Sequence, residues 1–449
     1  MATAPNKPRR YHIRTMGCQM NEHDSEKMAG LLEAMGYEPT ERPEDADVLL
    51  FNTCSVRENP ERRLYGQVGS LRSLKERKPG MVIGICGCMT QQKTERERIE
   101  EQLKHVDLVF GTHNLHRLPE LLNRAQQGEH PVVEVWDDPG EMIVEDLPVH
   151  RESDLKAFVT IMYGCDKHCT YCIVPYVRGR ERSRDPEKIL AEVRELAERG
   201  TKEVTLLGQN VNAYGKDRPS GIGFADLLLA VNDVPGLKRV RFTTSHPKDV
   251  DRGMIEAMRD GDKICEHLHL PVQSGSSRVL KRMGRRYNRD EYLALVDEFR
   301  REIPEIAITT DIIVGFPGET DEDFEDTLSL VERVGYDAAF TFIYSPRTGT
   351  PATRLVDQVP EPVKKERIYQ LIELQERIGL ARNEALVGTV QEVLLEGRSE
   401  NNPAVLAGRT RTNKLVHFEG DSLLVGELAP VRIERVHAHT LHGRRVEKP

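Results

Sequence analysis

The stretch Phe158-Val159-Thr160-Ile161-Met162-Tyr163-Gly164-Cys165-Asp166-Lys167-His168-Cys169-Thr170-Tyr171-Cys172 decides the fold class. A short apolar strand, expected at residues 158–162, runs directly into three cysteines with the spacing C-x3-C-x2-C. Thiolates are the ligands that iron-sulfur clusters use. The stretch therefore predicts a metal cluster at the end of a buried strand.

A zinc site is the alternative interpretation of these cysteines. Structural zinc prefers paired C-x2-4-C units and a fourth ligand, for which only His168 lies inside the motif. Three ligands on a four-iron cluster instead leave one iron open, and an open iron can chelate S-adenosylmethionine for radical cleavage. The spacing resembles that of the radical S-adenosylmethionine superfamily.

Further strands and helices alternate on the carboxyl-terminal side of this motif. Strands are expected at 204–207, 239–243, 267–272, 308–314 and 339–344, so that six strand-helix units form a partial (β/α)6 barrel. The first helix is well marked, since Asp185 can cap it, Pro186 suits its first position and Gly200 follows its end. With a charged trailing helix at 363–386, we expect this barrel domain to span 156–385.

A second set of cysteines lies on the amino-terminal side. Strands expected at 11–15, 48–52, 81–85 and 106–110 predict a parallel α/β domain over 10–127, and Cys18, Cys54 and Cys88 each follow one of its strands. Because parallel strands end at one edge, the three thiols would converge on a second cluster. Cysteine is also a common buried small residue, so the residues alone leave both interpretations open. Cys86 and Cys265 are assigned to packing.

The remaining segments differ in composition. Residues 128–155 are acidic, contain three prolines and the only tryptophan, and are predicted to be a linker. Residues 386–449 contain short apolar strands separated by Gly397, Gly408, Gly420 and Gly426, which predicts a small all-β barrel. The overall fold class is thus α/β with a small all-β module at the end.

Composition limits the function classes. No apolar run of the 449 residues approaches the roughly 18 needed to span a bilayer, so we expect a cytoplasmic protein without membrane contact. In that compartment the eight cysteines predict metal binding rather than disulfides. A net charge of -9 excludes a protein that coats nucleic acid indiscriminately.

Several longer motifs resemble those of the methylthiotransferase family of radical S-adenosylmethionine enzymes. They are Gly17-Cys18-Gln19-Met20-Asn21, Asn52-Thr53-Cys54-Ser55-Val56-Arg57, Gly87-Cys88, and the run from Met162 through Cys172 to Val174-Pro175-Tyr176-Val177-Arg178-Gly179. From Gly388 onward the chain looks like that family's RNA-binding TRAM module. The resemblance covers nearly the whole chain and is strongest to the tRNA-modifying branch.

The resemblance implies a reaction and its cofactors. A methylthio group would replace the hydrogen at carbon 2 of an isopentenylated adenosine next to the tRNA anticodon. Two 4Fe-4S clusters would be held by Cys18, Cys54, Cys88, Cys165, Cys169 and Cys172. One S-adenosylmethionine would methylate a sulfur on the amino-terminal cluster, and another would yield the radical. The residues that act directly in catalysis remain unknown.

Other candidate site residues follow from strand ends and from basic runs. Cofactor contacts are expected at the ends of the barrel strands, and the resemblance to the superfamily supports several of these positions. They are Gly208, Gln209, Asn210, Ser245, Gln273, Val314 and Gly315, with Tyr171 near the adenine. Basic residues that could meet RNA phosphates are Arg178, Arg180, Lys281, Arg282, Arg285, Arg286, Arg409, Arg411 and Lys414. A solvated helix face is the alternative for the basic runs.

The expected partners are the tRNA anticodon stem-loop, an electron donor such as flavodoxin or ferredoxin, and a sulfur-delivery protein, around a monomeric enzyme. Two alternatives within the family act on threonylcarbamoyl-adenosine in tRNA or on an aspartate of a ribosomal protein. An alternative of another class is an RNA-binding iron-sulfur sensor without turnover.

Overall fold

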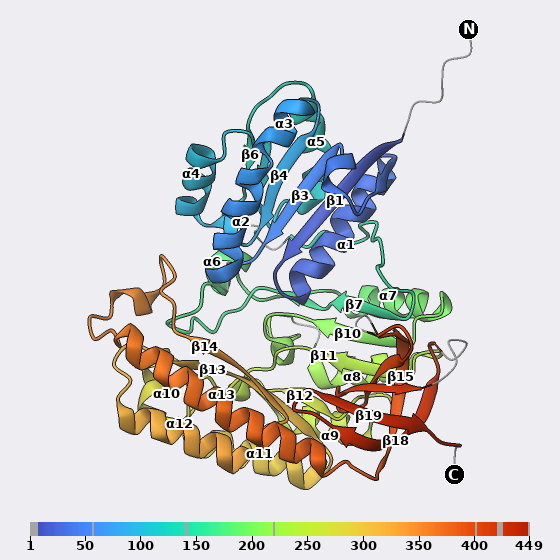
Figure 1. Ribbon diagram of the computed structural model, residues 1–449, viewed down its shortest axis with the longest axis vertical. Coiled ribbons are helices and arrows are strands. Elements are labelled where there is room, and N and C mark those ends of the chain that lie inside the picture. The colour runs from blue at the N-terminus through green and yellow to red at the C-terminus, as the bar shows by residue number, and fades with distance from the viewer. Residues whose placement is uncertain are drawn as a thin grey trace. The chain divides into compact units, whose positions relative to one another are not determined.

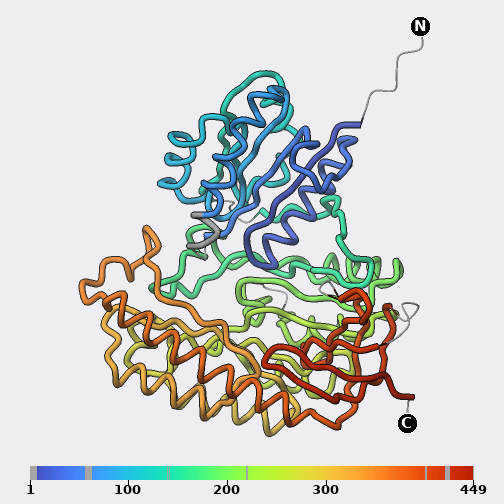
Figure 2. Tube along the Cα trace, viewed as in Figure 1, coloured from blue at the N-terminus to red at the C-terminus, as the bar shows by residue number. Residues whose placement is uncertain are grey.

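The computed structural model describes residues 8–55, 58–138, 140, 142–218, 221–399, 402–419 and 425–447. The chain forms two compact units (Figures 1 and 2). The first unit comprises residues 1–153, 160–166 and 172–184, and the second comprises 154–159, 167–171 and 185–449. Val56 and Arg57 of the Cys54 motif, and Gly420, lie outside the described residues.

The first unit contains a six-stranded parallel sheet, which confirms the predicted class. Its strands are β1 (Arg9–Met16), β2 (Tyr37–Pro39), β3 (Val48–Thr53), β4 (Val82–Gly87), β5 (Leu108–Phe110) and β6 (Val132–Glu134), in the order β2-β1-β3-β4-β5-β6. Met16 pairs with Thr53, and Thr53 pairs with Gly87, so β1, β3 and β4 end in register at one edge.

Helices cover both faces of this sheet (Figure 1). They are α1 (Gln19–Ala34), α2 (Glu58–Ser70), α3 (Arg72–Arg77), α4 (Lys93–Gln102) and α5 (Leu118–Gln126). Because side chains alternate along a strand, Leu50 packs with Met28 of α1 on one face, while Leu49 packs with Leu64 of α2 and Ile99 of α4 on the other. The continuous apolar strands follow from burial on both faces.

Two strands of this sheet lie outside the sequence prediction. The expected linker, residues 128–155, contributes β6, which pairs with β5, and β2 pairs with β1. Each of the two strands has only three residues, too few for a periodic pattern. The expected end of the α/β domain at residue 127 therefore falls before the last strand of its sheet.

The first unit also contains residues 160–166 and 172–184, which flank part of the C-x3-C-x2-C motif. Here β8 (Met162–Tyr163) pairs with β9 (Arg182–Ser183) as a short antiparallel ribbon, and α6 (Val174–Arg178) lies between them in the chain. Gly164 has φ +74°, and a Cβ there would collide with the carbonyl of Arg180. Glycine is thus required directly before Cys165.

The second unit contains the predicted six-stranded partial barrel. Its strands are β7 (Lys156–Thr160), β10 (Glu203–Leu207), β11 (Arg239–Phe242), β12 (His267–His269), β13 (Ala307–Val314) and β14 (Ala338–Ile343). They form two ladders, β11-β10-β7 and β12-β13-β14, joined by a bridge between Val240 and Ile264.

Helices alternate with these strands. They are α7 (Pro186–Glu198), α8 (Phe224–Asn232), α9 (Arg252–Asp260), α10 (Ser277–Met283), α11 (Arg289–Glu302) and α12 (Asp321–Val334), followed by α13 (Glu361–Glu384). Asp185 caps α7 as predicted, since its carboxylate accepts a hydrogen bond from Glu187 N at 2.9 Å. No helix within the described ranges is long and apolar enough to cross a membrane.

The carboxyl-terminal module is a closed five-stranded barrel in the order β15-β16-β17-β19-β18, as predicted. Its strands are β15 (Val390–Arg398), β16 (Leu406–Thr410), β17 (Leu415–Glu419), β18 (Leu428–Val436) and β19 (Thr440–Arg445). Arg239 donates to the carbonyl of Arg409 at 2.6 Å, and Arg241 to the carbonyl of Thr410 at 2.7 Å. These contacts fix the module against β11 of the same unit.

Candidate cluster sites

Cys18, Cys54 and Cys88 lie at the carboxyl edge of the first unit's sheet. Cys54 and Cys88 come directly after β3 and β4, and Cys18 is the second residue after β1. Cys54 and Cys88 are buried, whereas Cys18 is exposed at the amino terminus of α1. A hydrogen bond with the Cys54 thiol, helped by the charge of Arg178, lowers the pKa of Cys18 to about 6. The Cys18 and Cys54 thiols contact each other, and a readily formed thiolate at Cys18 suits metal binding. The described residues hold no group of three or more His, Cys, Asp or Glu side chains already arranged as a metal site.

Buried side chains hold the cysteine loops in place. The side chains of Asn21 and Asn52 hydrogen-bond each other at 2.9 Å, and Asn52 also donates to Ser25 Oγ at 2.9 Å. Thr53 Oγ1 donates to the carbonyl of Cys86 at 2.8 Å. Gly87 has φ +98°, and a Cβ there would collide with the carbonyl of Thr53, so only glycine lets the Cys88 loop approach the Cys54 loop this closely.

Arg178 of α6 reaches the same edge within the first unit. Its Nε donates to Cys88 Sγ at 3.2 Å, and its Nη1 forms an ion pair with Asp24 Oδ2 at 2.7 Å. The arginine is only 4% exposed. Burial raises the pKa of the Cys88 thiol, and Arg178 opposes that rise. A buried cation beside this sulfur therefore favours its thiolate form.

The two remaining cysteines are both buried. Cys86 packs in the core against Met28, with its Sγ 3.6 Å from Met28 Sδ, and burial holds its pKa well above the usual range. Cys265 is also buried, and its pKa is likewise raised by burial. Both positions agree with the packing role expected from the sequence.

The motif Cys165, Cys169 and Cys172 occupies the loop that follows β7 and β8. Cys169 is buried, and the other two thiols are half-buried. Within the second unit, Nη1 of Arg285 lies 3.5 Å from Cys169 Sγ. The same guanidinium donates to Tyr287 Oη at 2.9 Å and to the carbonyl of Pro271 at 2.8 Å.

The cofactor residues predicted in the second unit lie at successive strand ends. Asn210 is buried and donates to Asp249 at 2.8 Å, while its Oδ1 accepts from His246 N at 3.1 Å. Gln273, which has φ +74°, is buried beside β13. Gly315 has φ +70°, and its N donates to Glu319 at 2.8 Å. The other predicted positions here are Gly208 and Val314, both buried, and Gln209 and Tyr171, both half-buried.

Three buried polar atoms at these strand ends have no partner among the described residues. They are Ser245 Oγ, His246 Nε2 and Tyr344 Oη. A buried polar group without a hydrogen bond is costly, so each of these atoms is available to a water molecule or to a polar ligand. Ser245 was predicted from its position after a strand. Tyr344 was missed, because nothing in its local sequence separates a ligand contact from packing.

The predicted RNA contacts differ widely in exposure. Arg178 and Arg285 are buried on cysteine sulfurs, so we correct these two predictions, since neither side chain faces solvent in this structure. Arg282 pairs with Asp357 at 2.7 Å, Arg411 pairs with Glu266 at 2.7 Å and Lys414 pairs with Asp337 at 2.8 Å. Arg409 donates to the carbonyl of Asn413 at 3.1 Å. Arg180, Lys281 and Arg286 are exposed.

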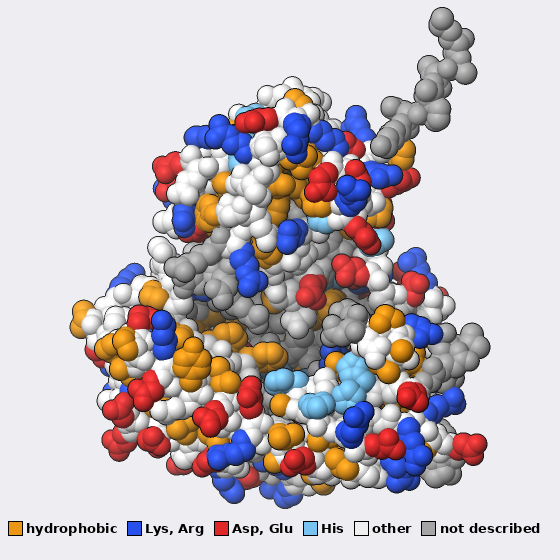
Figure 3. All heavy atoms as spheres, in the orientation of Figure 1, with side chains coloured by type: hydrophobic (Ala, Val, Ile, Leu, Met, Phe, Trp, Pro, Cys, Tyr) orange, Lys and Arg blue, Asp and Glu red, His pale blue; other side chains and the backbone are white. Residues whose placement is uncertain are grey.

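The small barrel also carries histidines on its outside. His417 and His442 are neighbours across β17 and β19 and stack with ring centroids 5.4 Å apart, and His437 meets His442 edge-on at 5.3 Å. Figure 3 shows histidine side chains gathered on the face that carries this module. Imidazole rings of this kind can stack on unpaired bases.

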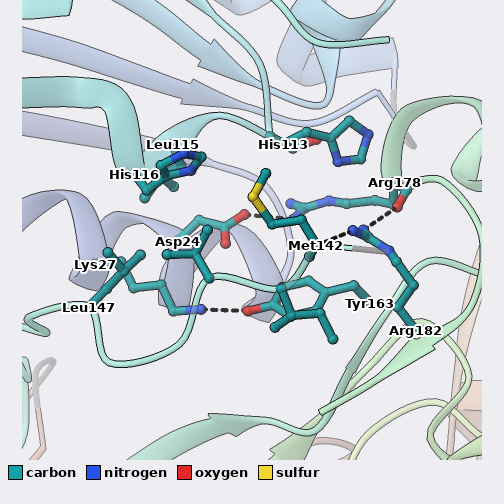
Figure 4. Close-up of a pocket in the computed structure, with 13 residues that line it drawn as sticks. Asp24, Lys27, His113, Leu115, His116, Met142, Leu147, Tyr163, Arg178 and Arg182 are labelled. Atoms are coloured by element: carbon teal, nitrogen blue, oxygen red, sulfur yellow. Dashed lines mark hydrogen bonds and ion pairs between the residues drawn. The ribbon is translucent and has the colours of Figure 1, made fainter. Parts of the chain in front are cut away.

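A cavity of about 60 Å³ lies beside Arg178 in the first unit (Figure 4). Lys27 and Tyr163, hydrogen-bonded at 3.0 Å, line it together with His113 and Arg182. Burial, with the charges of Arg182 and Arg178, lowers the pKa of His113 to about 4, so the imidazole is neutral at pH 7. The charged groups that line the cavity are Lys27, Arg178, Arg182 and Asp24, and Asp24 pairs with Arg178.

Known proteins have sequences similar to that of this chain over nearly its whole length. The chain is 56% identical over 437 residues to the tRNA-2-methylthio-N(6)-dimethylallyladenosine synthase of Thermoanaerobacter sp. (strain X514), with 97% of this chain and 93% of that protein covered. The chain belongs to the family of the tRNA-2-methylthio-N(6)-dimethylallyladenosine synthases. The family member of Symbiobacterium thermophilum is also 56% identical, over 98% of this chain and 95% of its own length.

Three family models match the synthase-family chain in succession. They are the uncharacterized protein family UPF0004 over residues 10–111, the radical SAM superfamily over 159–331 and the TRAM domain over 384–446. Membership of the radical SAM superfamily implies a 4Fe-4S cluster and S-adenosylmethionine. Within the second unit, the Cys169 thiol and the polar atoms of Ser245, His246 and Tyr344 that lack a partner among the described residues are chemically suited to these two groups.

Solved structures share the fold of this synthase-family chain at low identity. The radical S-adenosylmethionine methyltransferase TsrM from Kitasatospora setae, solved with cobalamin and a 4Fe-4S cluster bound, is similar with a TM-score of 0.54 and 14% identity, over 86% of this chain and 80% of that one. The cobalamin-dependent S-adenosylmethionine radical enzyme OxsB gives a TM-score of 0.51 and 12% identity, over 83% and 56% of the chains.

Proposed function

We propose that this protein replaces the hydrogen at carbon 2 of N6-isopentenylated adenosine, next to the tRNA anticodon, with a methylthio group. The observation that carries the proposal is the presence of two separate three-cysteine sets in a chain that is 56% identical to synthases named for this product. The carboxyl-terminal barrel, matched by the TRAM model, supports an RNA substrate. A tRNA substrate also fits the expected cytoplasmic location.

The carbon-hydrogen bond that must be broken explains why the fold holds a radical site. An aromatic carbon-hydrogen bond of low acidity offers a side-chain base no practical proton to remove. We assign Cys165, Cys169 and Cys172 to hold the 4Fe-4S cluster that, when bound, supplies the electron for cleaving S-adenosylmethionine. Asn210, Ser245, His246 and Tyr344 are assigned to orient that S-adenosylmethionine, because they lie at strand ends and present polar atoms there.

The auxiliary cysteines are assigned to a second 4Fe-4S cluster. Cys18, Cys54 and Cys88 would hold it, and its open iron would carry the sulfur that enters the product. The network of Asn21, Asn52 and Ser25 fixes the first two ligand loops. An electron donor such as flavodoxin or ferredoxin and a source of sulfur complete the reaction. Arg180, Lys281 and Arg286 are proposed as phosphate contacts, because their side chains are exposed.

The proposal is tested with a panel of substrates. The anaerobically reconstituted protein is incubated with S-adenosylmethionine, reductant and sulfide, in parallel with isopentenylated tRNA, threonylcarbamoylated tRNA and a ribosomal protein. Mass spectrometry then measures the methylthio product. We expect product only on isopentenylated tRNA. Product only on another substrate would show that the protein belongs to a sibling branch of the family. Release of 5′-deoxyadenosine without any methylthio product would refute methylthiolation.

A further inference from the structure

Each cysteine set has one buried guanidinium on one of its sulfurs. Arg178, 4% exposed, donates from Nε to Cys88 Sγ at 3.2 Å, and Arg285, 5% exposed, has Nη1 3.5 Å from Cys169 Sγ. Each contact lies within a single compact unit. The sequence places these arginines in two unrelated basic runs, so their common position on a ligand sulfur is a property of the fold.

The two guanidinium groups differ in how their charge is balanced. Asp24 forms an ion pair with Arg178 at 2.7 Å, and both side chains are buried. Arg285 instead donates to Tyr287 Oη and to the Pro271 carbonyl, and no ion pair involves it in the described part of the chain. An unpaired buried cation is unfavourable unless negative charge lies beside it. A bound cluster and its cysteine ligands would supply that charge.

A positive charge and an N–H donor beside a ligand sulfur change the reduction potential of an iron-sulfur cluster. Reduction adds one electron from an external one-electron reductant and makes the cluster more negative. The arginine stays protonated throughout, and no bond to the protein forms or breaks. Hydrogen bonds to cluster sulfurs and nearby positive charge stabilise the reduced form more than the oxidised form.

We propose that Arg178 and Arg285 are positioning residues that each raise the reduction potential of the one cluster whose sulfur they contact. The inference rests on the proposed function, since it takes Cys18, Cys54 and Cys88 as ligands of a second cluster. Because Asp24 offsets the charge of Arg178, the effect of Arg285 on its own cluster is the larger of the two.

The test measures the potential of each cluster alone in the full-length chain. A Cys165→Ala/Cys169→Ala/Cys172→Ala background leaves only the auxiliary site, and a Cys18→Ala/Cys54→Ala/Cys88→Ala background leaves only the other. Arg178→Met and Arg285→Met are introduced into both backgrounds, and the potential is followed by electron paramagnetic resonance during titration with dithionite. Each substitution thereby serves as the control for the other.

We expect Arg285→Met to lower the reduction potential of the cluster on Cys169. At a fixed solution potential, the ratio of reduced to oxidised cluster should fall about tenfold, which corresponds to about 59 mV for a one-electron couple. Arg178→Met also lowers the reduction potential of the auxiliary cluster, but the ratio of reduced to oxidised form falls only about threefold. Neither shifts the cluster of the other background. Unchanged potentials, or equal shifts in both backgrounds, would overturn the proposal.

Asp24→Asn tests the same claim without removing an arginine, and it carries the test if Arg178→Met does not retain iron. Loss of the carboxylate leaves the charge of Arg178 unbalanced beside Cys88, so the auxiliary potential rises. A fall, or no change, contradicts the proposal. Absence of a cluster in the Cys165→Ala/Cys169→Ala/Cys172→Ala background, before any arginine is changed, would instead refute the two-cluster function on which the inference rests.

Discussion

Asn21 and Asn52 connect the first two cysteine loops through a reciprocal pair of hydrogen bonds. Asn21 Nδ2 donates to Asn52 Oδ1 at 2.9 Å, and Asn52 Nδ2 donates to the Asn21 carbonyl at 2.7 Å. Both side chains are buried. A buried amide that loses its partner leaves a desolvated polar group behind, so this pair makes the position of Cys18 dependent on that of Cys54.

Asn52→Ala should therefore weaken both the fold and the auxiliary site. The change removes the bonds to Asn21 and Ser25, while Asn21 Nδ2 keeps the Thr53 carbonyl at 3.3 Å and Ser25 Oγ keeps Thr15 Oγ1 at 2.7 Å. We expect the loss to cost about 1 to 3 kcal/mol of unfolding free energy. Urea unfolding and iron content measure the two effects. Asn123→Ala on the exposed side of α5 is the matched control. Full iron content in Asn52→Ala would contradict the role of the pair.

Cysteine substitutions distinguish ligands from packing residues. We expect Cys54→Ala to lose about half of the bound iron, because one of two clusters requires three thiolates. Cys86→Ala should keep all of its iron and cost about 1 kcal/mol of stability, since Cys86 only packs in the core against Met28. Iron and sulfide analysis of the reconstituted variants checks both. Iron loss in Cys86→Ala would make that thiol a ligand.

Variants of Arg411 and Arg445 test two roles independently: attachment of the small barrel to the rest of its unit, and contact with RNA. Arg411 binds Glu266 at 2.7 Å and the carbonyls of Asp262 and Ile264 at 2.9 and 2.6 Å, so Arg411→Ala should lower the free energy of unfolding by about 1 to 3 kcal/mol. Its effect on the salt dependence of tRNA affinity should be negligible.

Arg445 is exposed at the end of β19. Arg445→Ala should leave the melting temperature unchanged and reduce the slope of log affinity against log salt by about 0.7 to 0.9. Binding isotherms at several salt concentrations, alongside thermal melting, provide the measurement. A reduced slope for Arg411→Ala would restore the phosphate contact predicted from the sequence.

His246 makes stability sensitive to acid. Burial, with the charge of Arg285, lowers its pKa to about 2, and its neutral Nδ1 accepts from Lys248 N at 3.2 Å. A histidine with a depressed folded pKa contributes stability above its unfolded pKa of about 6.5, and this is lost as pH falls below that value. Between pH 7 and 5 the loss is about 2 kcal/mol.

His246→Asn preserves the cap on Lys248 and removes the titration. We expect this variant to lose about 2 kcal/mol less stability than the parent between pH 7 and 5, measured by urea unfolding without S-adenosylmethionine. His439→Asn, at an exposed position, controls for loss of a histidine. Parallel pH profiles for the parent and His246→Asn would show that His246 is protonated in the folded protein.

The sequence predicted the elements whose signals are local and missed those that depend on tertiary contact. Cys18, Cys54 and Cys88 could be located after strands of one sheet, because apolar strands followed by Cys are visible in the chain and parallel strands end together. The role of these and of the other three motif cysteines as ligands stays a prediction. The three-residue strands β2 and β6 carry no periodic signal. The basic runs were visible, but the burial of Arg178 and Arg285 was not, since the sequence does not show the direction of a side chain.

The division of labour between the two cysteine sets is the central claim, and one variant tests it most directly. Cys18→Ala/Cys54→Ala/Cys88→Ala is incubated with isopentenylated tRNA, reductant, sulfide and S-adenosylmethionine, and both products are quantified by mass spectrometry. The account predicts that 5′-deoxyadenosine is still released while no methylthio product forms. Methylthio product at the parent's level would show that these cysteines are dispensable and would contradict the account.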